Sequence, residues 1–300
     1  MTVTIKSYLR QQRQRVEQAL EQYIPAADGV FQHHLEAMRY SLFVGGKRIR
    51  PILCLAAGNA IDNRPETQTN LLPVGCALEC IHTYSLIHDD LPAMDDDALR
   101  RGHPTNHMVY GEAAAILAGD GLLSWAFELL SNPETSTLGA ETRLAIIRII
   151  THAAGSFGMV GGQVLDIANE NQQVSFETLR TIHSAKTGAL ITASVHAGAV
   201  GAGGSRDQVD SLIEYGHQIG LAFQIIDDLL NVTATTEQLG KTAGSDIEHG
   251  KATYPGFFGV EETRNRALEA VTLSKKAIAD FDQKADPLRQ LADYIYSRSH

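Results

Sequence analysis

The pattern of apolar and polar positions predicts helices nearly throughout the chain. All nine prolines lie outside residues 134–254, where Ala and Leu dominate and Glu, Gln and Arg are interspersed. That stretch also lacks alternating runs of Val, Ile and Thr, so its composition favours helix over strand. Turn-forming clusters interrupt the pattern at residues 62–65, 131–133, 201–205 and 240–250. The segments between them have roughly the 20–30 residues of long bundle helices, which predicts an all-α protein.

Size, composition and charge narrow the class of protein. Residues 1–300 show no shift in composition and no short repeat, so we expect one large helical domain. Hydrophobic residues make up 44% and charged residues 20% of the chain, which excludes intrinsic disorder. A formal net charge of −10 argues against non-specific nucleic-acid binding. No apolar run approaches about 18 residues, so no membrane-spanning helix is expected.

The N-terminal segment and the cysteines predict a cytoplasmic location. The first 20 residues lack the apolar core and cleavage site of a signal peptide and have the pattern of an exposed helix. The cysteines number three, and Cys76 and Cys80 lie only four positions apart. We therefore expect buried thiols in a reducing compartment and no disulfide framework.

The first candidate site is an acidic cluster, with five carboxylates within residues 89–97 directly after an apolar helical stretch. Like charges so close together repel each other unless cations lie among them. A solvated acidic loop is the alternative, but Leu91, Pro92 and Met94 make this loop poorly suited to solvent. Carboxylates suit Mg²⁺, Mn²⁺ or Ca²⁺, and the spacing is not that of an EF-hand. Because Mg²⁺ usually binds few protein carboxylates together with substrate phosphates, the cluster predicts a phosphorylated ligand.

A second acidic pair, Asp227 and Asp228, follows another apolar helical run 138 positions after the first. On a helix, Asp227 and Asn231 share a face. One such pair is usually structural, but two at the ends of apolar helices indicate that facing helices hold metal ions from both sides.

Cations cluster near flexible or acidic segments in this acidic chain. They are found in residues 45–51, 100–102 and 186–188 and at Lys241 and Lys251. Each alone is typical of a solvated surface charge. Together they predict two diphosphate sites, one held through metal ions and one through guanidinium and ammonium groups. His82 lies two helical turns before Asp89 and is expected on nearly the same face.

These motifs resemble those of the short-chain trans-prenyl diphosphate synthases, with bacterial farnesyl diphosphate synthases as the nearest pattern. The matching segments are Gly46-Lys47-Arg48-Ile49-Arg50-Pro51, Asp89-Asp90-x4-Asp95 with Arg100-Arg101-Gly102, Gly162-Gln163-x2-Asp166, Lys186-Thr187-Gly188, Gln224-x2-Asp227-Asp228, Lys241 and Lys251. They run in order over roughly residues 30–298. The resemblance implies a helical bundle around a deep central cavity, usually as a homodimer. It also implies Mg²⁺-dependent head-to-tail condensation of isopentenyl diphosphate with an allylic diphosphate through an allylic carbocation.

The resemblance assigns a role to each matching residue. The implied metal ligands are Asp89, Asp90 and Asp95 for two Mg²⁺ ions and Asp227, with Asp228, for a third, Mn²⁺ being an alternative ion. The implied contacts of the allylic diphosphate are Arg100, Lys186, Thr187, Gln224, Lys241 and Lys251, of which Lys186, Thr187 and Gln224 lie beside the reacting carbon. The implied contacts of isopentenyl diphosphate are Lys47, Arg50, His82 and Arg101. No protein nucleophile is implied, and the sequence offers no convincing Ser/His/Asp or Cys/His arrangement.

Product length is predicted from the residues just before the first acidic motif. Tyr84 lies five positions before Asp89, about 7.5 Å along a helix axis and turned by about 140°. With Ser85 beside it and extra residues in the Pro92-containing spacer, Tyr84 resembles the floor that stops chain growth in bacterial farnesyl synthases. The sequence therefore predicts a C15 product, with C10 geranyl or C20 geranylgeranyl diphosphate as alternatives.

One position departs from the family pattern, and two other functions, a terpene cyclase and a non-catalytic subunit, are alternatives. Asn231 stands where the second motif usually ends in Asp, and we expect activity to be retained because Asp227 is the main ligand. A terpene cyclase is disfavoured because Asn231 and Thr235 do not match the second motif of that class. A non-catalytic subunit of a heteromeric prenyl synthase is disfavoured because the first motif is intact.

Overall fold

The computed structural model describes residues 4–233 and 251–297, so the predicted site residue Lys241 lies outside the described residues. The elements are α1 Ile5–Tyr23, η1 Gly29–Phe31, α2 Gln32–Phe43, α3 Ile49–Ile61, α4 Pro65–Asp89, β1 Leu99–Arg100, β2 His103–Pro104, α5 Asn106–Tyr110, α6 Glu112–Ser131, α7 Ala140–Ala154, α8 Met159–Ala168, α9 Phe176–His183, η2 Ser184–Gly188, α10 Ala189–Gly201, α11 Arg206–Thr233, α14 Tyr254–Ala277, η3 Gln283–Ala285 and α15 Asp286–Ser297. The all-α prediction is confirmed.

Helix boundaries follow the turn signals of the sequence. Pro65 opens α4, where its missing N–H and fixed φ suit the first turn. The side chain of Ser175 accepts a hydrogen bond from the Thr178 amide and caps α9, and Thr253 caps α14 in the same way. The predicted breaks at 62–65, 131–133 and 201–205 all separate helices. The predicted break at 240–250 lies outside the described residues.

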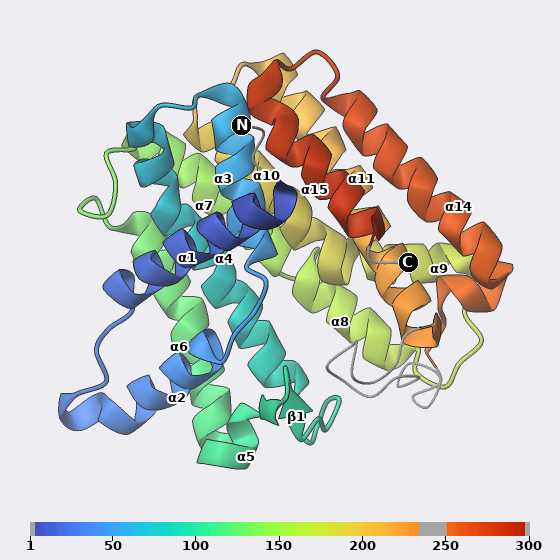
Figure 1. Cartoon of the computed structure of the whole chain (residues 1–300). Coiled ribbons are helices and arrows are strands. Elements are labelled where there is room, and N and C mark those ends of the chain that lie inside the picture. Colours follow the sequence, from blue (N-terminus) through green and yellow to red (C-terminus); the bar gives the residue numbers. More distant parts are fainter. Residues whose placement is uncertain (1–3, 234–250, 298–300) are drawn as a thin grey trace.

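The helices pack as a bundle around α10, which contacts α3, α4, α7 and α11 (Figure 1). One buried cluster joins α4, α6 and α7, and another joins α11, α14 and α15. Residues of α3 and α10 contribute to both clusters, so these two helices connect the two halves of the core. The arrangement leaves α4 and α11 on opposite sides of a space that α8, α9 and η2 border.

Three local features were not expected from the sequence. Strands β1 and β2 form a short antiparallel hairpin immediately after the acidic loop. Residues 155–158 separate α7 from α8. The segment Ser184–Gly188 is a π-turn between α9 and α10, the kind of irregularity that often occurs at functional sites.

Within the part of the chain that the structure describes, two stretches are apolar and long enough to cross a membrane by length and composition alone, namely Glu112–Ser131 and Ala140–Ala168. This is weak evidence, because core helices of soluble proteins pass the same test. The second stretch is interrupted by the turn between α7 and α8. Only 39% and 33% of the two windows are buried, so much of their apolar surface faces outward. The expectation that no helix spans a membrane stays a prediction.

Candidate active site

A cavity of about 760 Å³ lies between α4, α8, α9, η2 and α11. This volume is in the usual range for small-molecule sites. The predicted site residues that line it are Arg50, His82, Tyr84, Ser85, Asp89, Asp95, Arg100, Arg101, Lys186, Thr187, Gln224, Asp227, Asp228 and Lys251. Lys47 and Asp90 are not among the lining residues. Side chains up to 201 positions apart in sequence, from Arg50 to Lys251, therefore meet around one space.

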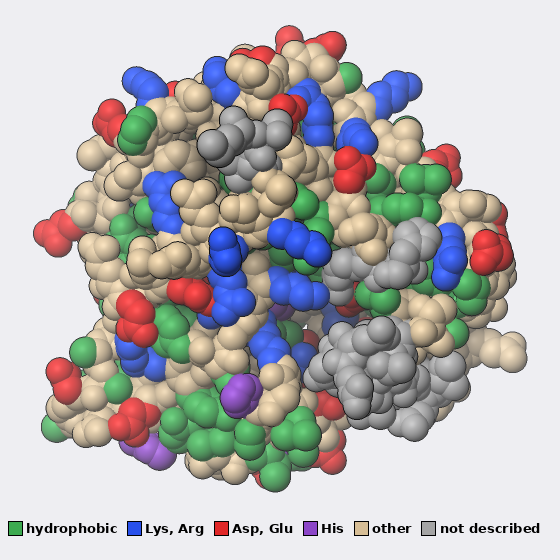
Figure 2. Space-filling model, viewed as in Figure 1, with side chains coloured by type: hydrophobic (Ala, Val, Ile, Leu, Met, Phe, Trp, Pro, Cys, Tyr) green, Lys and Arg blue, Asp and Glu red, His purple; other side chains and the backbone are tan. Residues whose placement is uncertain are grey.

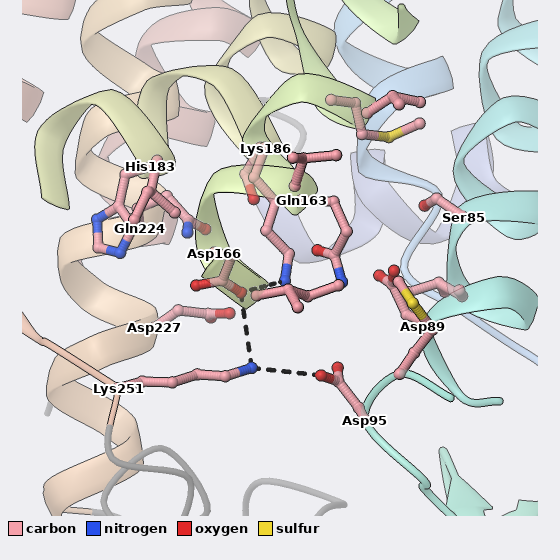
Figure 3. Close-up of a pocket in the computed structure, with 18 of the residues that line it drawn as sticks. Ser85, Asp89, Asp95, Gln163, Asp166, His183, Lys186, Gln224, Asp227 and Lys251 are labelled. Atoms are coloured by element: carbon pink, nitrogen blue, oxygen red, sulfur yellow. Dashed lines mark hydrogen bonds and ion pairs between the residues drawn. The ribbon is translucent and has the colours of Figure 1, made fainter. Parts of the chain in front are cut away.

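The C-terminal end of α4 positions the first acidic motif. Asp89 is the last residue of the helix, and the following loop turns back so that the Asp95 amide donates a hydrogen bond to the Asp89 carbonyl at 2.9 Å. Asp96 adopts a left-handed backbone conformation, with φ of 52°, within this turn. The loop thereby brings the carboxylates of Asp89 and Asp95 to the same wall of the cavity (Figure 3).

The carboxylates of this motif differ in their surroundings. Burial raises the pKa of Asp89 to about 6, although Lys186 and Arg100 partly oppose the shift. Asp90 is buried and faces the Arg100 Nε, which donates to its two oxygens at 2.6 and 2.8 Å. Asp90 is thus engaged in a bidentate ion pair beside the cavity, and its role as a metal ligand stays a prediction.

The opposite wall holds an ion-pair network centred on Asp166 of α8 (Figure 3). Lys186 Nζ donates to Asp166 Oδ2 at 2.7 Å, and Lys251 Nζ lies 3.6 Å from the same oxygen and 3.4 Å from Asp95 Oδ1. Burial opposes ionisation of Asp166, but Lys186 and Lys251 outweigh it and hold the pKa of this carboxyl below its usual range. Lys251 therefore bridges the two acidic walls.

The π-turn at Ser184–Gly188 presents Lys186 and Thr187 to the cavity. Gly162 of α8 makes this approach feasible, because a Cβ at that position would collide with the backbone nitrogen of Lys186. The segment Gly162-Gln163-x2-Asp166 belongs to the family pattern, and its sequence alone does not indicate what it does. Its structural purpose is to let α8 lie against the π-turn and to supply the carboxylate that orients Lys186.

Both carboxylates of the second acidic motif on α11 border the cavity, but they differ in their contacts. Asp227 lines the cavity on the wall opposite Asp89. Asp228 is buried, its Oδ2 accepts a hydrogen bond from the Tyr254 amide at 2.8 Å, and its Oδ1 lies 3.7 Å from His183 Nε2. Asn231 is only 2% exposed and does not line the cavity. The Asp228 carboxylate therefore fixes the start of α14, next to Lys251.

Arg50, His82 and Arg101 form a basic subsite at another side of the cavity. Figure 2 shows Lys and Arg side chains gathered beside the hollow on the face drawn there. Burial lowers the pKa of Arg50 to about 10 and also lowers the pKa of Arg101. Burial, followed by the charges of Arg50 and Arg101, lowers the pKa of His82 well below its usual value. The subsite is thus rich in desolvated cations beside a neutral imidazole, which suits a polyanion.

The loop before α3 completes the basic side. The Arg101 guanidinium donates to the Gly45 carbonyl, and a Cβ at Gly46 would lie 2.6 Å from Arg101 Nη1. Both glycines have positive φ, which only glycine adopts readily. Lys47 follows them and is exposed. The glycines therefore allow the loop to lie directly on Arg101.

The donor set fits hard divalent cations. Asp89 and Asp95 face Asp227 and Asp166 across the cavity, and carboxylates are the ligands that Mg²⁺ and Mn²⁺ prefer. Among residues 4–233 and 251–297, no group of three or more His, Cys, Asp or Glu is arranged to hold a metal ion by itself.

Comparison with known proteins agrees with this arrangement. The profile of the polyprenyl synthetase family matches residues 32–288. The chain is 46% identical to geranylgeranyl diphosphate synthase of Cyanophora paradoxa over 98% of this chain and 96% of that protein. It is 42% identical to farnesyl diphosphate synthase of Bacillus subtilis (strain 168) over the full length of both. The crystal structure of an FPP/GFPP synthase from Zymomonas mobilis superposes with a TM-score of 0.85 and 38% identity, covering 97% of this chain and 98% of that one.

The chain therefore belongs to the polyprenyl synthetase family, a family of prenyltransferases with an all-helical fold. The predicted family is confirmed. The compared relatives include both farnesyl and geranylgeranyl diphosphate synthases, so family membership leaves the product length open.

Proposed function

We propose that this chain condenses isopentenyl diphosphate with dimethylallyl and geranyl diphosphate to give farnesyl diphosphate. The observation that carries the proposal is the division of one cavity between facing carboxylates and a basic subsite. Two diphosphates of like charge can lie in one cavity only if each has its own counter-charges. The acidic walls suit a diphosphate bound through metal ions, and the basic side suits a diphosphate bound directly.

The allylic diphosphate belongs, on this proposal, between the acidic walls. Asp89, Asp95 and Asp227 would hold Mg²⁺, with three ions expected alongside the substrate and Mn²⁺ as an alternative. Bound Mg²⁺ would supply charge neutralisation for the departing diphosphate. Arg100, Lys186 and Lys251 add fixed positive charge on the same side, and such preorganised charge stabilises a leaving group as its negative charge develops.

Breaking the allylic C–O bond leaves a carbocation that must meet the isopentenyl double bond before water. Thr187 and Gln224 line the cavity, where their oxygen dipoles can stabilise the cation together with the Lys186 carbonyl. Holding both substrates in one orientation makes the bond-forming step nearly unimolecular. Loss of a proton then restores a double bond, with the released diphosphate as the base.

Isopentenyl diphosphate is assigned to Arg50, His82 and Arg101, with Lys47 at the outer edge of the loop. The lowered pKa values of Arg50 and Arg101 reflect desolvation, and an arriving dianion relieves it. His82 is neutral and offers a ring N–H without adding to the crowding of positive charge.

Tyr84 is our candidate for the floor of the elongation cavity. It is 7% exposed and lines the cavity next to Ser85, and its ring packs edge-on against His88 with centroids 5.6 Å apart. A ring held in this way blocks growth of the product beyond the space in front of it. The alternative product, geranylgeranyl diphosphate, is supported by the name of the Cyanophora relative.

A homodimer is also part of the proposal. The apolar side chains of Met108 and Val109 on α5 and Ile116 and Leu117 on α6 are between 44% and 59% exposed. A second copy of the chain would bury them. We further propose that residues 1–300 form one domain and act in the cytoplasm, in line with the buried free thiols of Cys54, Cys76 and Cys80.

The test is a product assay with the purified chain, Mg²⁺, isopentenyl diphosphate and either dimethylallyl or geranyl diphosphate. We expect a C15 alcohol from both starters after dephosphorylation. Tyr84→Ala should shift the product to C20 or longer, whereas Tyr84→Phe, which keeps the ring, should still give C15. A C10 or C20 product from the natural chain would overturn the farnesyl assignment, and no consumption of isopentenyl diphosphate would overturn the reaction.

A further inference from the structure

Arg48 is a buried cation that does not line the cavity. It lies between Lys47 and Arg50 at the start of α3 and is 2% exposed. Its Nη1 donates to Glu79 Oε1 at 2.7 Å, and its Nη2 donates to the Leu42 carbonyl at 2.7 Å. Its Nε lies 3.6 Å from Glu17 Oε1. One side chain thus connects α1, the end of α2 and the middle of α4.

The backbone of Arg48 is held in an unusual conformation by these contacts. Its φ and ψ of 53° and 35° fall in the left-handed region, which non-glycine residues adopt only when the surroundings impose it. Helix α3 begins at this turn, with the exposed Lys47 before it and Arg50, which lines the cavity, after it. The loop is held from its other side by Arg101, through the Gly45 carbonyl.

The partner of Arg48 is a buried carboxylate that could compete for the ligand-binding cations. Glu79 is 1% exposed, and its negative charge partly opposes the burial that lowers the pKa of Arg50 and of Arg101. A carboxylate in the core without a cation of its own draws neighbouring guanidinium groups toward it. Arg48 satisfies Glu79 and leaves Arg50 and Arg101 facing the cavity.

We propose that Arg48 is a positioning residue for isopentenyl diphosphate. It fixes the loop that carries Lys47 and Arg50, and it neutralises Glu79 so that Arg50 and Arg101 remain available to the diphosphate. This inference rests on the proposed assignment of Arg50, His82 and Arg101 to isopentenyl diphosphate. It predicts that Glu79 weakens the binding of isopentenyl diphosphate when Arg48 is replaced by a neutral residue.

The test compares Arg48→Gln, Glu79→Gln and the double variant, measuring the KM of each substrate at saturating levels of the other. We expect Arg48→Gln to raise the KM for isopentenyl diphosphate at least tenfold and to leave the KM for the allylic substrate within twofold. Glu79→Gln should leave both values within twofold, because Arg48 still holds the loop. Adding Glu79→Gln to Arg48→Gln should restore the part of the lost affinity that unpaired Glu79 removes, a coupling that a double-mutant cycle isolates.

A purely structural role predicts a different pattern. Both single variants would then lower the Tm and raise both KM values alike, and the double variant would not rescue isopentenyl diphosphate binding; this result would overturn the proposal. Arg13→Gln is the matched control, since Arg13 contacts the same Glu17 at 2.9 Å from an exposed position and should change neither KM. If the natural chain consumes no isopentenyl diphosphate, the proposed function fails before this inference is reached.

A second variant keeps the test decisive if Arg48→Gln does not fold. Arg48→Lys retains a charge opposite Glu79, but a single ammonium cannot reproduce the two divergent bonds to Glu79 and the Leu42 carbonyl. We expect it to raise the KM for isopentenyl diphosphate severalfold while the allylic KM stays constant. An unchanged KM for isopentenyl diphosphate in folded Arg48→Lys would contradict the proposal.

Discussion

The acidic and basic sides of the cavity each gather charges of one sign, and they differ in how those charges are neutralised. On the acidic side, the carboxylates of Asp95 and Asp166 are bridged by Lys251, and Asp90 is paired with Arg100. On the basic side, Arg50 and Arg101 are desolvated and face the cavity with lowered pKa values. The acidic walls can therefore exchange an internal cation for metal ions, whereas the basic side is prepared to receive an anion directly.

The difference teaches how one cavity can distinguish two diphosphates. On the proposed function, affinity for the allylic substrate should depend on metal concentration, because carboxylate-bound ions would supply its counter-charges. Affinity for isopentenyl diphosphate should depend on guanidinium groups that the protein itself supplies. Changes on the two sides should thus affect different kinetic constants.

The largest effect is expected on the acidic side. Asp89→Asn removes a half-buried carboxylate from the wall that faces Asp227 and should lower kcat/KM by about 10³-fold, a loss typical for a lost electrostatic stabiliser. Initial rates measured across a Mg²⁺ titration check this. Asp96→Asn, in the same loop but exposed, is the control and should leave the rate nearly unchanged. Equal losses in both variants would show that loop charge, and not the wall carboxylate, matters.

A change on the basic side should be smaller and selective. Arg50→Gln removes a charged donor, worth about 1.5–3 kcal/mol for a hydrogen bond to a charged group, and should raise the KM for isopentenyl diphosphate by about 10- to 100-fold. The KM for the allylic substrate should change little. Steady-state kinetics with each substrate varied in turn give the measurement. A matching rise in the allylic KM would mean that the two sides are not separate.

The basic side should also make the fold sensitive to acid. His82 has a pKa well below its usual value of 6.5 in the folded state, because burial and the neighbouring arginines disfavour its charged form. The unfolded state therefore binds one more proton as the pH falls below 6.5, and stability falls with pH in that window. The slope from this residue is at most about 1.4 kcal/mol per pH unit.

Denaturant unfolding of the natural chain and of His82→Asn between pH 7 and pH 5 measures this contribution. The variant should lose less stability on acidification than the natural chain. An identical slope in the two proteins would assign the acid sensitivity to other groups.

The smallest effect is expected where the second acidic motif departs from the family pattern. Asn231 is buried and lies outside the cavity lining, so Asn231→Asp should change kcat and the apparent Mg²⁺ affinity by less than about twofold, or 0.4 kcal/mol. The new buried carboxylate should instead lower the Tm. A large gain in Mg²⁺ affinity would show that the natural site is impaired by Asn231.

Much of this site could be predicted because its residues are marked by local sequence. Asp89, Asp95 and Asp227 stand out as carboxylates at the ends of apolar helices, and all three line the cavity. The exclusion of Asp90 from the cavity lining could not be predicted, because it depends on the β1–β2 hairpin, which places Arg100 next to Asp90. Sequence spacing alone does not reveal which of two adjacent carboxylates will form an ion pair with an arginine.

The fold was predictable in class but not in its irregular parts. Helix breaks at Pro65 and Pro133 are encoded by the prolines themselves. The π-turn before α10 has no such signal, since Ser184–Gly188 contains nothing that forbids an α-helix. It depends on packing against α8 at Gly162, 24 positions before Lys186, and long-range contacts of this kind lie beyond any local pattern.

This π-turn also constrains how the chain can vary in length. It places one more residue in the turn than an α-helix would, so α10 is rotated by about 100° relative to a continuous α9. Deleting a single residue between Ser184 and Gly188 would let α9 run on in regular geometry and would turn the buried face of α10 away from α3, α7 and α11. Insertions and deletions should therefore be tolerated in exposed loops but should disrupt the fold here, because the number of residues between α9 and α10 sets the orientation of α10.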